Sequence, residues 1–323
     1  MGDHRERPSC MRSDLLRLLA AAAVPVLCVA QTALKVDTAT VSCASLLASA
    51  RREFANQNYA AAVSAFQRAA AQCPPSADIL VELARAHLMA AEFRDCRAVA
   101  DRATAIDRRN ATALLLKGQA AYFLGEDKEA AQALLSAISI EPRREDTVYS
   151  LARIYCQQSR IDDAIAQFRK VVELNPKSFK AYDNLGLCFQ AKDEEELAIR
   201  HFLKALDLIQ TEQPVYAWPY VNLAALMLKR NEYRRAFDLA SEAAHRDPGL
   251  SKAFFLAGKA LAKLNSLDSS VKWLKRAIEL DPEYPEALYW LFKVQREQGR
   301  TEEAHAWAKA FQEARKKRRE DPR

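Results

Sequence analysis

The stretch VVELNPKSFKAYDNLG, residues 171–186, places a proline between two apolar helical segments. Proline has no backbone N–H to donate inside a helix, so Pro176 is expected to end the first segment. The second segment opens within a few residues of that proline and reaches Gly186. The stretch therefore predicts two helices joined by a tight connection.

Similar prolines follow other apolar runs at a regular spacing. Pro142 and Pro176 are 34 residues apart, as are Pro248 and Pro282, and Pro74 lies 68 residues, two such periods, before Pro142. The interval from Pro176 to Pro248 is 72 residues, which is two periods and four further residues. A fixed period in this range indicates a solenoid of stacked repeats, because a single repeat cannot bury its own apolar face.

Counting 34-residue units from the prolines yields eight units, of which the fifth contains the four further residues. The array spans 43–318 and is followed by a basic tail, 319–323. The units are 43–76, 77–110, 111–144, 145–178, 179–216, 217–250, 251–284 and 285–318. A residue's position within its unit is called its place below.

Two places hold small residues throughout the array. The twentieth place is small in all eight units: Ala62, Cys96, Ala130, Ala164, Ala198, Ala236, Ser270 and Ala304. The eighth place is Ala or Gly in seven units and Phe in the last: Ala50, Ala84, Gly118, Ala152, Gly186, Ala224, Gly258 and Phe292. Small residues on facing helices let two backbones approach closely, so these places are expected to meet inside each helix pair.

The composition agrees with a helical array. The chain has 323 residues, of which 50% are hydrophobic and 28% charged, and only seven are glycine. A folded chain with so few glycines is typical of helical hairpins rather than of sheets with many tight turns. No alternating strand pattern is present, so the fold class is predicted to be all-α.

The pattern resembles the tetratricopeptide repeat (TPR), whose signature is W-x2-L-G-x2-Y, then A-x3-F, then P. Unit five matches it with Tyr182, Leu185, Gly186, Phe189, Ala198 and Phe202. The resemblance implies a right-handed α-solenoid of eight antiparallel helix hairpins. In the fifth unit, the four further residues are expected to lengthen the second helix by about one turn before Pro214.

The residues before the array have a different character. Arg12 and Arg17 precede an uncharged run, 18–30, that ends at the small residue Ala30. This order is typical of a secretory signal peptide, predicted here as 1–30, with Met11 as a possible true start. Residues 31–42 form a polar linker. The chain is thus predicted to be exported, to a periplasm or outside the cell, and a retained N-terminal membrane anchor is the alternative.

Export would place five cysteines in an oxidising compartment. Cys43 opens the first helix of unit one and Cys73 closes its second. Antiparallel helices bring those two ends together, so a Cys43–Cys73 disulfide is predicted. The other cysteines, Cys96, Cys156 and Cys188, lie in separate units and are expected to be packing thiols.

Motifs for catalysis or cofactor binding are not found in this sequence. The five histidines are scattered, no Cys or His cluster has metal-ligand spacing, and no phosphate-binding glycine loop is present. The array uses residues 43–318, which leaves no length for a separate catalytic domain. The chain is predicted to be non-enzymatic, with neither a cofactor nor a metal.

The resemblance also implies a binding surface. In relatives, the first helix of each unit lines a concave groove, mainly through the second, fifth, sixth, ninth, twelfth and thirteenth places. The candidate peptide-binding residues on the first helices are Arg85, Arg153, Asn184, Asn222, Lys252, Lys259, Trp218, Phe255, Tyr289 and Trp290. The amides of Asn184 and Asn222 would hold a peptide backbone, the cations its carboxylates, and the aromatics an apolar anchor.

These features predict a scaffold or adaptor of the cell envelope that holds an extended, acidic peptide segment of a protein partner. An alternative with the same fold is an envelope glycan-binding protein that uses Trp218, Tyr289, Trp290 and the lysines. The net charge of +6 is modest for this length. Nucleic-acid binding is therefore not expected, and membrane contact through the tail EARKKRREDPR would be peripheral at most.

Overall fold

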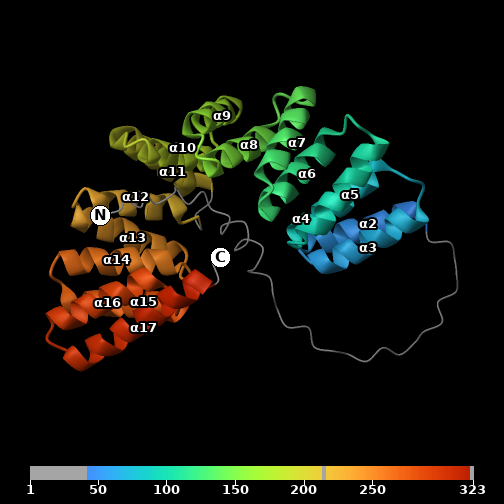
Figure 1. The fold of residues 1–323 in the computed structure, drawn as a ribbon. Helices are drawn as coiled ribbons and strands as arrows, with labels where there is room; N and C mark the ends of the chain where they lie inside the picture. Colours follow the sequence, from blue (N-terminus) through green and yellow to red (C-terminus); the bar gives the residue numbers. More distant parts are fainter. Residues whose placement is uncertain (1–41, 213–215, 321–323) are drawn as a thin grey trace, which may run out of the picture. The chain divides into compact units, whose positions relative to one another are not determined.

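The computed structural model describes residues 42–212 and 216–320, and within them every regular element is a helix (Figure 1). The predicted signal peptide, 1–30, and the linker up to residue 41 lie outside the described residues. The sixteen helices are α2 (Cys43–Ala55), α3 (Tyr59–Gln72), α4 (Ala77–Met89), α5 (Phe93–Ile106), α6 (Ala111–Leu124), α7 (Asp127–Ile140), α8 (Glu145–Gln157), α9 (Ile161–Leu174), α10 (Phe179–Ala191), α11 (Glu195–Glu212), α12 (Trp218–Lys229), α13 (Tyr233–Arg246), α14 (Ser251–Lys263), α15 (Leu267–Leu280), α16 (Pro285–Glu297) and α17 (Thr301–Glu320).

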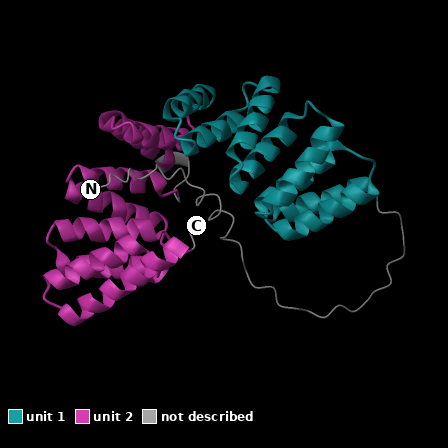
Figure 2. Cartoon of the chain, in the orientation of Figure 1, with its two compact units in different colours: residues 1–175 teal, residues 176–323 magenta. Residues whose placement is uncertain are grey.

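Consecutive helices pack in pairs, so the predicted fold class of antiparallel helix hairpins is confirmed. Seven of the eight first helices begin at the first residue of a predicted unit, and α12 begins at Trp218, one residue after Ala217. The chain divides into two compact units, each with four hairpins (Figure 2). Unit 1 contains α2 to α9 and ends at Asn175, and unit 2 contains α10 to α17 and begins at Pro176.

The recurring prolines act as the sequence predicts. In the stretch 171–186, α9 ends at Leu174, and Asn175 follows with extended backbone, φ −138° and ψ 93°. A residue before proline is pushed out of the helical region by the proline ring, so the helix ends two residues before Pro176. Asp247 before Pro248 and Asp281 before Pro282 have the same extended conformation.

The eighth and twentieth places meet inside each hairpin. In α14 and α15, the Ser270 hydroxyl donates to the Gly258 carbonyl at 2.7 Å. A Cβ added to Gly118 would lie 3.1 Å from the Ala130 carbonyl oxygen, and one added to Gly186 would lie 2.5 Å from the ring of Phe202. Phe202 is fully buried and has no room to move aside. The small residues therefore permit the close helix contact on which each hairpin is built.

Two helices are longer than their counterparts. The predicted extra turn is present in α11, which has 18 residues, whereas the second helices α5, α7 and α9 have 14 each. The last helix, α17, has 20 residues and continues to Glu320, so the start of the predicted tail 319–323 is helical. None of the helices in the described ranges combines the length and the apolar character that a bilayer crossing requires.

The turn inside every hairpin contains one residue with left-handed backbone, at the fifteenth place of each unit. Glycine occupies this place twice, as Gly125 and Gly299. In the other six hairpins the residue has a Cβ and a φ of 58° to 62°: Gln57, Ala91, Ser159, Asp193, Asn231 and Asn265. Left-handed backbone costs an L-residue roughly 1–2 kcal/mol, so the packing of the two helices must impose this conformation.

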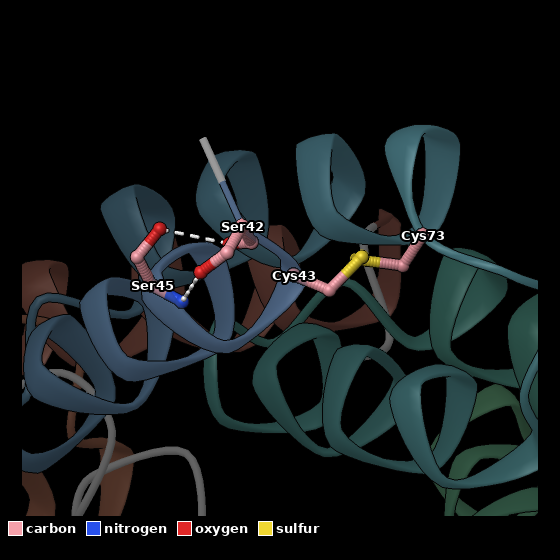
Figure 3. Close-up of a disulfide and its surroundings, with 4 residues drawn as sticks. All are labelled: Ser42, Cys43, Ser45 and Cys73. Carbon is pink, nitrogen blue, oxygen red and sulfur yellow. Dashed lines mark hydrogen bonds between the residues drawn. A yellow bond between two sulfur atoms is a disulfide. The ribbon is translucent and has the colours of Figure 1, made fainter. Parts of the chain in front are cut away.

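A disulfide joins the two ends of the first hairpin (Figure 3). The sulfurs of Cys43, the first residue of α2, and Cys73, the residue after α3, are 2.30 Å apart, and their Cα atoms are 5.5 Å apart. Ser42 caps α2 by accepting a hydrogen bond from the Ser45 amide. Ala50 is the one buried residue of α2, and the partly buried Leu46, Leu47 and Phe54 of this helix pack against the core beside it.

The remaining thiols in the described residues, Cys96, Cys156 and Cys188, are buried and are not part of a disulfide. Burial raises the pKa of the Cys96 thiol to about 12, because the apolar surroundings disfavour the thiolate. Cys96 therefore acts as a small core residue at its twentieth place.

Replacing both Cys43 and Cys73 with serine should loosen the first hairpin. A disulfide that closes a loop of this length stabilises a chain by about 3–4 kcal/mol in the loop-entropy model. We expect amide hydrogen exchange within residues 43–73 to become at least tenfold faster in the double variant, while exchange in later hairpins changes little. Wild-type protein treated with reductant serves as the control and should match the variant; unchanged exchange in both would contradict the stabilising role.

Replacing Ala91 with glycine should stabilise the second hairpin, because Ala91 has a φ of 60°. Relief of the left-handed strain outweighs the greater freedom of glycine in the unfolded chain, so the expected gain is roughly 0.5–1 kcal/mol in the free energy of unfolding. Chemical denaturation measures it. The neighbouring Ala90→Gly is the matched control, because φ there is −78°. That variant should lose stability, and a similar loss from Ala91→Gly would contradict the strain argument.

Candidate functional site

Four lysines and two tryptophans gather on the first helices of unit 2. The first helix α14 contacts the first helices on both sides of it, α12 and α16. These three helices supply the residues named here the lysine–tryptophan surface: Trp218 from α12, Lys252, Lys259 and Lys263 from α14, and Trp290 and Lys293 from α16. Both tryptophans are half-buried.

Three ammonium groups surround the indole of Trp290. The Nζ atoms lie 4.9 Å from the ring centroid for Lys293, 5.5 Å for Lys259 and 5.8 Å for Lys263. An indole attracts a cation at this range through the negative charge of its faces, with about 0.5–1 kcal/mol at an exposed site. The ring therefore holds three positive charges close together, although they repel one another.

A smaller arrangement of the same kind lies at Trp218. The Nζ of Lys252 is 5.7 Å from the centroid of that indole. Phe255, also on α14, is buried, with 7% of its surface exposed, and its ring lies 5.1 Å from that of Tyr284 and 5.9 Å from the Nζ of Lys259. The Phe255 ring thus contacts the ammonium group of Lys259. Phe255 is too buried to serve as an apolar anchor for a peptide.

The charges of this surface are balanced differently from those at the hairpin turns. At the turn after α12, hydrogen bonds to Glu195 and Asp193 raise the pKa of Lys229, and Arg230 pairs with Glu196 and Glu232. In contrast, Lys263 and Lys293 form no ion pair with any residue in the described ranges. Lys263 and Lys293 therefore contribute positive charge to the lysine–tryptophan surface.

The two predicted asparagines are engaged within unit 2. The Asn222 side-chain nitrogen donates to the Asp183 carboxylate at 2.9 Å, and these side chains are 4% and 2% exposed. The Asn184 side-chain nitrogen donates to the Lys180 carbonyl of its own helix at 2.8 Å. Because the Asn222 side chain is buried and bonded to Asp183, we assign Asn222 to the packing of α10 against α12.

Tyr289 belongs to a separate aromatic group near the end of the array. It is 42% exposed, and its ring lies 5.5 Å from Phe311 and 6.3 Å from Phe292. Tyr289 therefore faces the contact between α16 and α17, whereas its neighbour Trp290 faces the lysines.

The predicted cations Arg85 and Arg153 lie in unit 1. Arg153 stacks over the ring of Tyr122 at 4.9 Å and donates to its hydroxyl at 3.1 Å, while Arg85 is exposed on α4. Neither is on the three helices that form the lysine–tryptophan surface. Lys263 and Lys293 complete that surface but were not among the candidates, although lysines four residues apart on one helix, Lys259 and Lys263, are a sequence signal for a shared face.

One group in the described part of unit 1 could offer metal ligands. Single atoms of His87, Glu92 and Asp95 lie within 4.8 Å of one another. The His87 Nδ1 and Glu92 carboxylate are 2.6 Å apart and form a hydrogen bond across the turn after α4. That bond connects the end of α4 to the start of the next helix, which gives the buried His87 a structural role.

Family models match much of the helical array, but not α11, α12, α13, α17 or most of α2. A model described as TPR repeat matches residues 152–193 and 258–299, and two described as tetratricopeptide repeat match residues 53–120 and 111–144. Together the matched residues are more than half of the chain. The chain belongs to the tetratricopeptide repeat family, which is a family of protein-interaction scaffolds and is generally non-catalytic.

Individual relatives are distant. A BBSome complex member BBS4 homolog of Drosophila melanogaster is 23% identical over 155 residues, which are 48% of this chain and 31% of that protein. The TPR repeat-containing protein YpiA of Bacillus subtilis (strain 168) is 26% identical over 144 residues, which are 45% of this chain and 33% of that protein. The matches span about a third of the length of these curated relatives.

Among solved structures, a tetratricopeptide repeat protein from Parabacteroides merdae is similar, with a TM-score of 0.61 and 16% identity. The similarity covers 79% of this chain and 98% of that one. At this identity the likeness supports the fold alone.

Replacing Asn222 with alanine should reduce stability more than binding. The change removes a donor from the buried carboxylate of Asp183, and such a loss costs about 1–3 kcal/mol. Chemical denaturation of Asn222→Ala, Asp183→Asn and the double variant forms a double-mutant cycle that isolates the coupling. A coupling near zero would contradict the structural assignment and return Asn222 to the ligand surface.

Proposed function

We propose that this protein is an exported scaffold or adaptor, and that its lysine–tryptophan surface holds an extended, acidic peptide segment of a protein partner. The observation that supports this most is the convergence of three lysines on Trp290. Ammonium groups bind carboxylates, and the indole between them offers apolar area to the rest of the peptide. One surface therefore provides both parts of acidic-peptide recognition.

The cell envelope is proposed as the location. Residues 1–30 have the order of a secretory signal peptide, and the Cys43–Cys73 disulfide is of a kind that persists in oxidising compartments. An assembly role agrees with the name of the fly relative, which describes a member of a protein complex. Holding a flexible tail of one protein beside another is a function that a repeat surface can perform without chemistry.

Binding of an acidic peptide should depend on the lysines around Trp290. The probe is a fluorescein-labelled 14-residue peptide of alternating Glu and Leu, and peptides with Lys or Ser in place of Glu are its controls. We expect the triple variant Lys259→Ala, Lys263→Ala, Lys293→Ala to bind the Glu peptide at least tenfold more weakly by fluorescence anisotropy. The affinity should also fall with added salt, because the lysines lie near the surface.

A second triple variant separates a specific site from general charge. Lys272, Lys275 and Lys309 are exposed lysines on the second helices α15 and α17, so replacing them with alanine removes the same net charge elsewhere. This control should bind within about twofold of wild type. Equal weakening in the two triple variants would show attraction by net charge alone and would contradict the proposed site.

Acidic glycans of the envelope are the second candidate, because Trp218 and Trp290 are partly exposed and each has a lysine at its ring. Aromatic rings can stack on sugars while lysines bind acidic groups. A glycan array run beside the peptide assay distinguishes the two functions: glycan binding that is lost in the first triple variant, with no binding of the Glu peptide, would favour this candidate.

A further inference from the structure

The two tryptophans divide the lysine–tryptophan surface into two subsites that differ in charge. The first subsite consists of Trp218 from α12 and Lys252 from α14. The second consists of Trp290 and Lys293 from α16, with Lys259 and Lys263 from α14. The first has one ammonium group at its ring and the second has three, and α14 contributes to both.

We infer that the bound segment contains two acidic–apolar clusters about five or six residues apart, one for each tryptophan. This inference rests on the proposed function and specifies the pattern that the surface selects. A uniformly acidic segment without the spacing would engage one subsite at a time.

The spacing follows from the arrangement of the first helices. Because α14 contacts both α12 and α16, the tryptophans lie on helices two steps apart. Packed helices have axes about 8–10 Å apart, so two steps correspond to roughly 16–20 Å. An extended chain advances about 3.3 Å per residue, and it therefore needs about five or six residues to cover that distance.

Each subsite requires an acidic and an apolar group together. Without ligand, the ammonium groups lie within 6 Å of the indole rings. An attraction of this kind is weaker than a charge-assisted hydrogen bond between an ammonium group and a carboxylate. A carboxylate of the peptide therefore draws a lysine away from the ring, and the uncovered indole face becomes available to the apolar side chain beside that carboxylate.

The unequal charge of the subsites also sets the composition of the two clusters. The single lysine at Trp218 matches one carboxylate, whereas three lysines at Trp290 match two or three. The segment should thus be acidic at both ends of the spacing but more so at one end. Both orders along the peptide are therefore included in the test.

Peptides with two clusters, Glu-Leu and Glu-Glu-Leu, test the inference in full-length protein. Their leucines are separated by three, six or twelve residues through Gly and Ser spacers, in both orders. Three residues cannot span the subsites, so this peptide should bind no more tightly than a single cluster. Six residues should bind at least tenfold more tightly, and twelve about threefold more weakly than six, because effective concentration falls with spacer length.

A variant at Lys252 tests whether the gain comes from the first subsite. Lys252→Ala should reduce the affinity for the six-residue peptide toward that of the single Glu-Glu-Leu cluster, and should reduce the affinity for the single cluster much less, because that cluster matches the three lysines at Trp290. Lys272→Ala is the matched control and should change neither. This pattern would support two subsites.

Other outcomes separate the inference from the proposed function. If affinity rises with the number of glutamates regardless of spacing, and still depends on the lysines at Trp290, the spacing is wrong but acidic-peptide binding stands. If neither single nor paired clusters bind to wild-type protein, the proposed function and the inference both fail.

Discussion

The fold depends on the close approach of two helix backbones in each hairpin, at the eighth and twentieth places. Glycine, alanine, cysteine or serine is found at nearly all of these positions, and the Ser270 hydroxyl reaches the Gly258 carbonyl across the contact. Larger side chains such as Phe202 then fill the space beside the contact rather than the contact itself. Since each hairpin must present the same faces to the next, this one constraint determines the period of the whole chain.

Much of the fold could be predicted because its signals are local and repeated. The prolines end second helices, and the four residues added in the fifth unit lengthen α11, as expected from their place in the period. The left-handed turn residue could not be predicted, because glycine occupies it in only two of eight hairpins. Its conformation results from the packing of both helices, which overrides the preference of Ala91 or Gln57 for right-handed backbone.

The repeat pattern alone predicts only part of the candidate site. The lysines and tryptophans of the first helices could be assigned to one face from their places alone. The bond between Asn222 and Asp183 joins residues 39 apart in sequence, so it depends on the register between two hairpins across the inserted turn. A pattern that treats each unit separately assigns Asn222 to a ligand, whereas the neighbouring hairpin provides its partner. The comparisons with relatives identify the family but are too distant to decide such a residue.

The disulfide makes the first and last hairpins of the array unequal in stability. A linear stack of hairpins opens most easily from its ends, where a hairpin has only one neighbour. The first hairpin is closed covalently by Cys43 and Cys73, while the last ends in the long, highly charged helix α17. Of these two hairpins, the last one described, which contains Trp290 and Lys293, should therefore fray more readily. A ligand bound at Trp290 would stabilise this hairpin, as the disulfide stabilises the first. Resistance to proteolysis would then increase with the fraction of the protein that has ligand bound.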